Sequence, residues 1–295
     1  MIKLGGPVFM AQQKAAGAGE SHGAAGIDPV LLARKHKEKG FTAAYVPQID
    51  AKDTALVMAT REAFQKEGVM LSEAGYWENI MDTEAESRAY HRNRQLDSLY
   101  LAEEIGAVCS VNIFGSYCHG NGNSQHKALN FTDEAFEAAV EMARYFLDTV
   151  KPKTAFFTYE IFPFDITDSV ENIERLIKAV DRKQFGVHLD LVNLINCPRA
   201  YFSSGDIAKE CVRRFGDRIV SCHAKDIKMK EPSISVILEE VLMGQGNIDL
   251  KTFMRQIEGL SRPIPFMLEH LKTEAEYDSA AEYVRKTGKE LGINL

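Results

Sequence analysis

No apolar stretch in this sequence is long enough to cross a membrane. A spanning helix needs about 20 apolar residues in succession, and the apolar runs within the 295 residues are all much shorter. Residues 1–6 also lack the apolar core that a secretory signal requires. These absences predict a cytoplasmic protein without a membrane partner.

Cysteine is scarce, and no two cysteines form a Cys-x-x-Cys pair. Their odd number and their scatter indicate reduced thiols in the cytosol rather than a disulfide framework. The five are Cys109, Cys118, Cys197, Cys211 and Cys222.

Positive charge is in deficit as well. The sequence has 35 lysines and arginines against 42 aspartates and glutamates, which gives a net charge of −7. Because binding of nucleic-acid phosphates requires a basic surface, this balance argues against a nucleic-acid partner. The hydrophobic share of 45% is ordinary for a globular protein with a sizeable core. The composition is compatible with a homo-oligomer.

The sequence has no proline- or serine-rich linker, and its organisation is an alternation of apolar strand-like runs with helical patterns. Such alternation is typical of parallel βαβ units. Strands are expected at residues 2–5, 42–46, 69–74, 107–114, 155–160, 185–190, 219–223 and 265–270. Helices are expected at residues 28–40, 53–66, 83–105, 204–215, 249–258 and 273–289, and from residues 132 and 168 onward.

Eight strands and eight helices in one chain predict an α/β fold, a single-domain (β/α)8 TIM barrel over residues 1–295. A doubly wound open sheet is the alternative. It is disfavoured because no dinucleotide fingerprint follows the first strand. The glycines of residues 115–122 lack that spacing, and no helix follows them.

The most informative stretch is residues 185–193, an apolar run that carries His188 and Asp190. Alternate side chains of a strand share a face, so both should point to the same side while Val187 and Leu189 point to the other. Three further strands also end in a residue that can bind a metal ion. The set of four is Glu160, Asp190, His223 and Glu269.

Successive members of this set are separated by 30, 33 and 46 residues, each gap matching one βα unit. In a (β/α)8 barrel the carboxyl ends of the strands meet at the face that carries the chemistry. The four side chains should therefore surround one point. Three carboxylates and one imidazole suit one divalent ion, Mn²⁺ before Mg²⁺ or Co²⁺, better than structural zinc.

Several short motifs carry a resemblance to a known family. The sequence resembles the xylose-isomerase-like sugar isomerase/epimerase superfamily over nearly its whole length, most specifically in a His-x-Lys-Asp run and a Gly-x-Gly-x-Ile-Asp turn. The matching segments are Glu160 after its strand, Leu189-Asp190, His223-Ala224-Lys225-Asp226, Gly244-Gln245-Gly246-Asn247-Ile248-Asp249 and Leu268-Glu269.

The resemblance implies an enzyme of carbohydrate metabolism with a small sugar as its substrate. Ketose 3-epimerases of this group bind one metal through Glu, Asp, His and Glu, and the two glutamates also form the acid/base pair. Carried over to this sequence, the pair is Glu160 and Glu269.

The sequence departs from the family pattern at one place. Many members have a substrate-contacting histidine three residues after the aspartate of the sixth strand, where this chain has Asn193. His188 lies before the aspartate instead, and can support the metal ligands, contact the substrate or be a satisfied core histidine. The departure bears on the substrate more than on the metal.

Three further residues are candidates for substrate binding. His119 lies in the glycine-rich loop after the fourth strand, where it can act as an additional acid or base or simply be solvated. Trp77 follows the third strand and can stack on a sugar ring or pack at a loop base. Lys225 should face inward beside His223 and hold a substrate oxygen or pair with a carboxylate.

Four functions remain open from the sequence. The preferred one is a metal-dependent isomerase or epimerase that acts through an enediolate on a ketose or keto-sugar. The second is a lyase or dehydratase that expels a β leaving group from a keto-sugar or 3-keto-glycoside. The third is an endonuclease for abasic sites. Such enzymes share the barrel fold, but their chemistry requires more histidines than the strand ends offer and a basic groove. A non-catalytic sugar-binding module needs no paired carboxylates.

Overall fold

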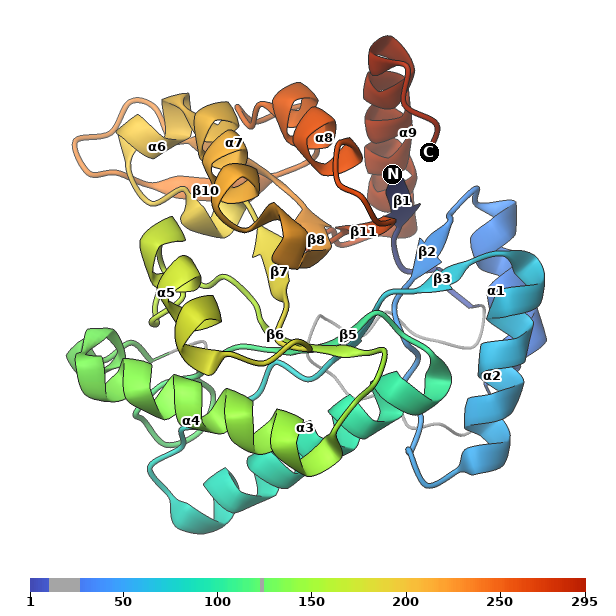
Figure 1. Cartoon of the computed structure of the whole chain (residues 1–295). Coiled ribbons are helices and arrows are strands. Elements are labelled where there is room, and N and C mark those ends of the chain that lie inside the picture. Colours follow the sequence, from blue (N-terminus) through green and yellow to red (C-terminus); the bar gives the residue numbers. More distant parts are fainter. Residues whose placement is uncertain (11–26, 123–124) are drawn as a thin grey trace.

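The computed structural model describes residues 1–10, 27–122 and 125–295. Parallel strands form the wall of an α/β barrel with the long helices outside it (Figure 1). The strands of this wall are β1 (Ile2–Gly5), β2 (Ala43–Ala44), β3 (Met70–Leu71), β4 (Glu73–Gly75), β5 (Cys109–Asn112), β6 (Phe156–Tyr159), β7 (Val187–Asp190), β8 (Ile219–Ala224) and β11 (Ile264–Leu268).

Two sheets share the wall of the barrel. One has the order β3-β2-β1-β11-β8-β7, and the other has the order β4-β5-β6. They meet at two places. Only Ser72 separates β3 from β4, and parallel bridges from Phe157 to Phe185 and from Glu160 to His188 join β6 to β7. The expected (β/α)8 barrel is confirmed, with the third expected strand divided in two.

The outer helices largely follow the expected positions, and their starts are capped as the sequence suggests. Asp28 accepts hydrogen bonds from the first turn of α1, and Thr273 forms a capping box with Glu276 at the start of α9. The helices are α1 (Pro29–Glu38), α2 (Thr54–Glu67), α3 (Ala85–Ile105), α4 (Asp133–Val150), α5 (Val170–Val180), α6 (Pro198–Phe202), α7 (Ser204–Phe215), α8 (Leu250–Glu258) and α9 (Glu274–Leu291).

A hairpin after β8 was not expected from the sequence. Its strands β9 (Asp226–Met229) and β10 (Leu238–Val241) pair antiparallel outside the barrel sheet. Asp226 anchors the returning chain, because its carboxylate accepts hydrogen bonds from the backbone of Gly244 and Gly246 at 2.9 Å. The hairpin consequently starts beside the end of β8, close to His223.

Between the wall and the helices lies an apolar layer, in which Phe157 packs on Phe146 and Phe266 on Phe253. Some buried residues of the barrel strands are polar instead, including Glu73, Ser110, Asn112, Thr158, His188, Ser221 and His223. Since buried polar groups are costly unless they find partners, these residues mark the place where the fold supports a site. None of the helices in the described ranges is long and apolar enough to cross a membrane.

Candidate metal centre

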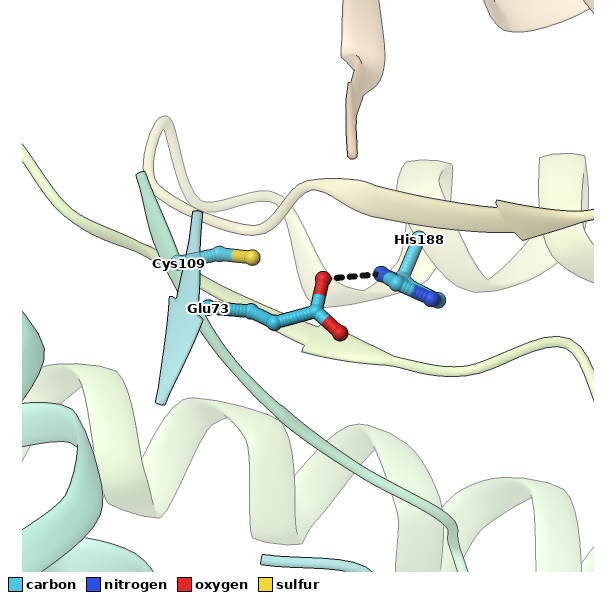
Figure 2. A group of neighbouring side chains, drawn as sticks. All are labelled: Glu73, Cys109 and His188. Atoms are coloured by element: carbon cyan, nitrogen blue, oxygen red, sulfur yellow. Dashed lines mark ion pairs between the residues drawn. The ribbon is translucent and has the colours of Figure 1, made fainter. Parts of the chain in front are cut away.

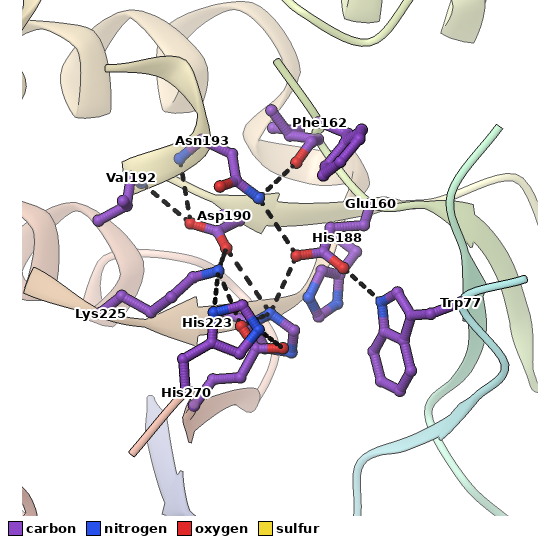
Figure 3. Close-up of polar contacts among 12 residues, drawn as sticks. Trp77, Glu160, Phe162, His188, Asp190, Val192, Asn193, His223, Lys225 and His270 are labelled. Carbon is purple, nitrogen blue, oxygen red and sulfur yellow. Dashed lines mark hydrogen bonds and ion pairs between the residues drawn. The ribbon is translucent and has the colours of Figure 1, made fainter. Parts of the chain in front are cut away.

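Four strand ends deliver the residues that the sequence predicts as metal ligands. Each residue offers one ligand atom, and the four atoms lie within 4.8 Å of one another. We call this set the acidic centre. It consists of Glu160 after β6, Asp190 at the end of β7 and His223 in β8, which Figure 3 labels, and of Glu269 after β11.

His223 stands in the middle of the acidic centre. Its Nδ1 atom lies 3.1 Å from Glu160 Oε1 and 2.9 Å from Glu269 Oε2. Asp190 Oδ2 is 3.7 Å from the same nitrogen. One ring nitrogen thus faces three carboxylates, which is the arrangement expected around a shared cation.

Asp190 is held so that one oxygen points to this common place. Its Oδ1 atom accepts hydrogen bonds from the backbone of Val192 at 3.0 Å and of Asn193 at 3.3 Å. Asp190 Oδ2 and Glu269 Oε2 are both buried, and the groups nearest to them are the cationic side chains of Lys225 and His223. Carboxylate oxygens that converge on one buried point suit a hard divalent ion, so this donor set fits Mn²⁺, Mg²⁺ or Co²⁺.

Lys225 supplies a positive charge at the edge of the acidic centre. Its Nζ atom lies 2.6 Å from Asp190 Oδ2 and 2.8 Å from Glu269 Oε2. Burial alone would raise the pKa of Asp190, but Lys225 and His223 lower it to about 2. The carboxylate of Asp190 is therefore ionised at every physiological pH.

The charges act on His223 in the opposite sense. Burial alone would lower the pKa of the His223 imidazole, but the carboxylates of Glu269 and Glu160 raise it well above its ordinary value. The pKa of Glu269 moves the other way: burial would raise it, and His223 and Lys225 bring it well below its usual range.

Trp77 and Asn193 both reach Glu160. The indole N–H of Trp77 donates to Glu160 Oε2, and Asn193 Nδ2 lies 3.4 Å from Glu160 Oε1 while it donates to the carbonyl of Ile161 (Figure 3). Trp77 also has a φ of +41°, a value that few residues other than glycine adopt. The two side chains orient one carboxylate of the acidic centre.

The two remaining histidine candidates lie in different surroundings. His188 is fully buried, with its ring edge-on to His223 at a centroid distance of 4.1 Å. His119 is 70% exposed, and its Nδ1 atom lies 3.1 Å from Asp82 Oδ1. Within the part of the chain that the structure describes, its hydrogen bonds are with Asp82 and Gln125 and not with the acidic centre. The geometry gives His188 a supporting position and keeps His119 at the surface.

Glu73 is a site residue to which the sequence assigned no role. Its Oε1 atom lies 2.9 Å from His223 Nε2, the ring nitrogen opposite the acidic centre. Its other oxygen lies 3.4 Å from His188 Nδ1 (Figure 2). The signal available in the sequence was a glutamate near the end of an expected strand.

The hairpin brings a second residue that the sequence did not assign. Glu240 Oε2 of β10 lies 2.8 Å from His270 Nδ1, and Glu240 Oε1 lies 3.5 Å from Lys225. A cavity of about 150 Å³ opens here, lined in part by Lys225, Glu240, Glu269 and His270. The acidic centre thus borders a polar cavity on the side of Glu269.

The fold and the site together define an α/β barrel whose strand ends gather a candidate centre for a divalent metal ion. Residues 20–287 match the family model of the xylose isomerase-like TIM barrel, and the chain belongs to this family. No curated protein matches the chain closely enough to count as a relative.

Solved structures share the barrel at low sequence identity. A D-psicose 3-epimerase from Clostridium cellulolyticum H10, determined with D-tagatose, has a TM-score of 0.67 at 14% identity over 97% of this chain and 99% of its own. A probable 3-DHS dehydratase from Bacillus anthracis has a TM-score of 0.64 at 13% identity, covering 88% and 94%. A barrel protein from Mycobacterium smegmatis in complex with magnesium has a TM-score of 0.63 at 15% identity, covering 88% and 87%. At such identities the likeness establishes the fold alone.

Proposed function

We propose that this protein is a metal-dependent isomerase or epimerase that acts through an enediolate on a ketose or keto-sugar. One observation carries the proposal: the carboxylates of Glu160 and Glu269 approach the same nitrogen of His223, at 3.1 and 2.9 Å. Two carboxylates at one point can serve both faces of a small substrate. The likeness to a D-psicose 3-epimerase over nearly the whole chain supports this reading.

The residues of the acidic centre would hold one divalent ion, Mn²⁺ by preference, which would supply a Lewis acid for the sugar oxygens. Glu160, Asp190, His223 and Glu269 would be its ligands. The free cysteines and the absence of a spanning helix in the described ranges agree with the cytoplasmic location that we propose.

The proton transfers belong to the two glutamates. One glutamate, as the carboxylate, removes the proton from the carbon beside the ketone, and the other, protonated from solvent beforehand, returns a proton to the opposite face. Trp77 holds the carboxylate of Glu160 in place by its indole hydrogen bond. His223 and Lys225 favour the ionised form of Glu269, and Lys225, 2.8 Å from Glu269 Oε2, can donate to a substrate oxygen. Charge stabilisation carries more of the barrier than the base, because such carbon acids are weak.

The test of this function is exchange of the carbon-bound proton with solvent. Protein loaded with Mn²⁺ is incubated in D₂O with a panel of ketoses and keto-sugars, and deuterium at the carbon beside the ketone is followed by mass spectrometry and NMR. We expect exchange together with epimerisation that needs the metal. Binding of metal and sugar without exchange would instead indicate a sugar-binding module.

A second function, elimination by a lyase or dehydratase, is favoured by the cavity beside Glu269. A departing group needs both room and a proton, and His270 lines this cavity of about 150 Å³. Burial alone would lower the pKa of His270, but Glu240 and Glu269 raise it. A product that is lighter than the substrate by one water, or by the expelled aglycone of a keto-glycoside, would identify this reaction.

A variant of His119 tests whether this surface histidine takes part in either reaction. We expect His119→Ala to leave epimerisation largely intact, because Glu160 and Glu269 perform both proton transfers. If His119 protonates a leaving group, the same change should slow elimination by about 10²–10⁴-fold, the usual size of an acid–base contribution. Rates of variant and wild type are compared on the active substrate. His270→Asn, which tolerates the φ of +59° at that position, tests the other histidine.

Metal uptake should release about one proton per ion at pH 7, because a histidine binds a metal ion only as the neutral imidazole. The raised pKa of His223 means that the ring is protonated in the metal-free protein at that pH. Affinity for Mn²⁺ should therefore fall as the pH is lowered. Calorimetry in two buffers with different ionisation enthalpies measures the released proton. Equal heats in both buffers would contradict the expectation.

A further inference from the structure

The two nitrogens of the His223 ring face different parts of the barrel. Nδ1 points into the acidic centre, with Glu269 Oε2 at 2.9 Å. Nε2 points away from it, to Glu73 Oε1 at 2.9 Å. Both sides of this ring are buried. The ring therefore bridges the acidic centre and one carboxylate behind it.

Glu73 is itself fixed from several sides. It stands in β4, across the barrel from β8, and its Oε2 atom accepts hydrogen bonds from Ser221 Oγ at 2.7 Å and Ser72 Oγ at 3.2 Å. Ser221 precedes His223 by two residues on β8, so the two side chains share a face of the strand. The carboxylate is thereby held beneath the ring by the same strand that carries the ring.

We propose that Glu73 is a positioning residue for the metal centre, which keeps the proton of neutral His223 on Nε2 and so leaves the Nδ1 lone pair for the metal ion. A neutral imidazole can carry its proton on either nitrogen, and only the bare nitrogen binds a metal. A carboxylate at Nε2 accepts that proton's hydrogen bond and also makes Nδ1 a better donor. Loss of such a partner typically costs about 10–100-fold in metal affinity.

A different use of Glu73 has to be weighed against this one. Glu73, Cys109 and His188 form a second buried group whose ligand atoms lie within 4.8 Å of one another (Figure 2). Neither nitrogen of His188 has a hydrogen-bond partner in the described chain, so a second ion could be sought there. Both oxygens of Glu73 are already engaged, however, by His223, Ser221 and Ser72. The geometry favours support of the first centre.

The experiment compares three variants. Glu73→Ala removes the acceptor, Glu73→Gln keeps one oxygen that can accept from Nε2, and Cys109→Ser alters the second group without touching His223. Binding of Mn²⁺ is measured by electron paramagnetic resonance of the free ion, and metal per chain by elemental analysis. We expect a Kd weakened by about 10–100-fold for Glu73→Ala, less than tenfold for Glu73→Gln, and no change for Cys109→Ser.

A second readout follows the ring itself. In protein labelled with ¹⁵N at histidine and loaded with diamagnetic Mg²⁺, the imidazole nitrogens report which of them carries the proton. We expect His223 with its proton on Nε2 in the wild type and in Glu73→Gln. This measurement keeps the proposal testable if Glu73→Ala does not fold.

Each contrary result is distinct. A proton on Nδ1 of His223, or a folded Glu73→Ala that keeps the wild-type Kd, overturns the positioning role. Two ions per chain, reduced to one by Cys109→Ser, assign Glu73 to a second metal site instead. The inference rests on the metal centre of the proposed function but not on its reaction. If the wild type binds metal but turns over no sugar, the proposed reaction is contradicted and the positioning role is not. If the wild type binds no metal, the proposed function and the positioning role are both contradicted.

Discussion

Glu160→Gln and Glu269→Gln are each expected to abolish epimerisation. Glutamine has nearly the shape of glutamate, so its amide oxygen can still accept the hydrogen bond from Trp77 at position 160. It cannot take up the proton of a carbon acid, and it is a weaker metal ligand. Removal of one acid–base group costs about 10²–10⁴-fold. Activity within about tenfold of wild type, or roughly 1.4 kcal/mol of barrier, would refute the mechanism with two bases.

Loss of a ligand and loss of a base can be separated in these variants. Rates are measured at Mn²⁺ concentrations that saturate each variant, so that weaker binding no longer limits them. Each single variant should still exchange deuterium into one epimer of the substrate, through its remaining glutamate, without interconverting the epimers. Glu239→Gln is the matched control, because Glu239 precedes Glu240 on β10 and pairs on the surface with Lys230.

The strand ends show most clearly what can be predicted from the sequence. Glu160, Asp190, His223 and Glu269 could be placed because each closes an apolar run, and because a barrel brings the ends of neighbouring strands to one face. The period of the βα units carried this argument without any knowledge of side-chain contacts. The meeting of these four side chains at one place was therefore predictable from the sequence.

The role of Glu73 beside His223 could not be predicted by the same reasoning. Its partners Ser221 and His223 are 148 and 150 residues away, and they meet it only because β4 and β8 face each other across the closed barrel. No spacing along the chain signals such a pair. The hydrogen bond of Trp77 could not be foreseen for a similar reason: the sequence placed Trp77 where it could stack on a sugar ring or pack at a loop base, and the structure adds that its indole donates to Glu160.

The hairpin of β9 and β10 was missed because of its composition. Its strands are four residues each, and charged residues such as Lys228, Glu239 and Glu240 interrupt them. Short polar segments of this kind have no apolar period by which to recognise a strand. Their pairing depends on the anchor that Asp226 gives to Gly244 and Gly246, which is a contact between distant parts of the loop.

Asp190→Ala is expected to lose the metal while the fold survives. Asp190 offers Oδ2 to the acidic centre and is ionised at neutral pH. Its removal takes away a charged ligand, so the loss in Mn²⁺ affinity should exceed the 10–100-fold that is typical of supporting residues, that is, more than about 100-fold. Removing one partner of a buried ion pair often costs about 3–5 kcal/mol, because it leaves a charge unpaired.

Lys225 is the reason why the barrel should tolerate this change. Its Nζ atom keeps Glu269 Oε2 at 2.8 Å and Glu240 Oε1 at 3.5 Å, so the ammonium retains carboxylate partners when Asp190 is replaced. Circular dichroism should show an intact fold, and elemental analysis should show little bound metal. Asp206→Ala is the control, since Asp206 is an exposed aspartate of α7 that pairs with Lys209. Full metal occupancy in Asp190→Ala would mean that the ion is bound elsewhere.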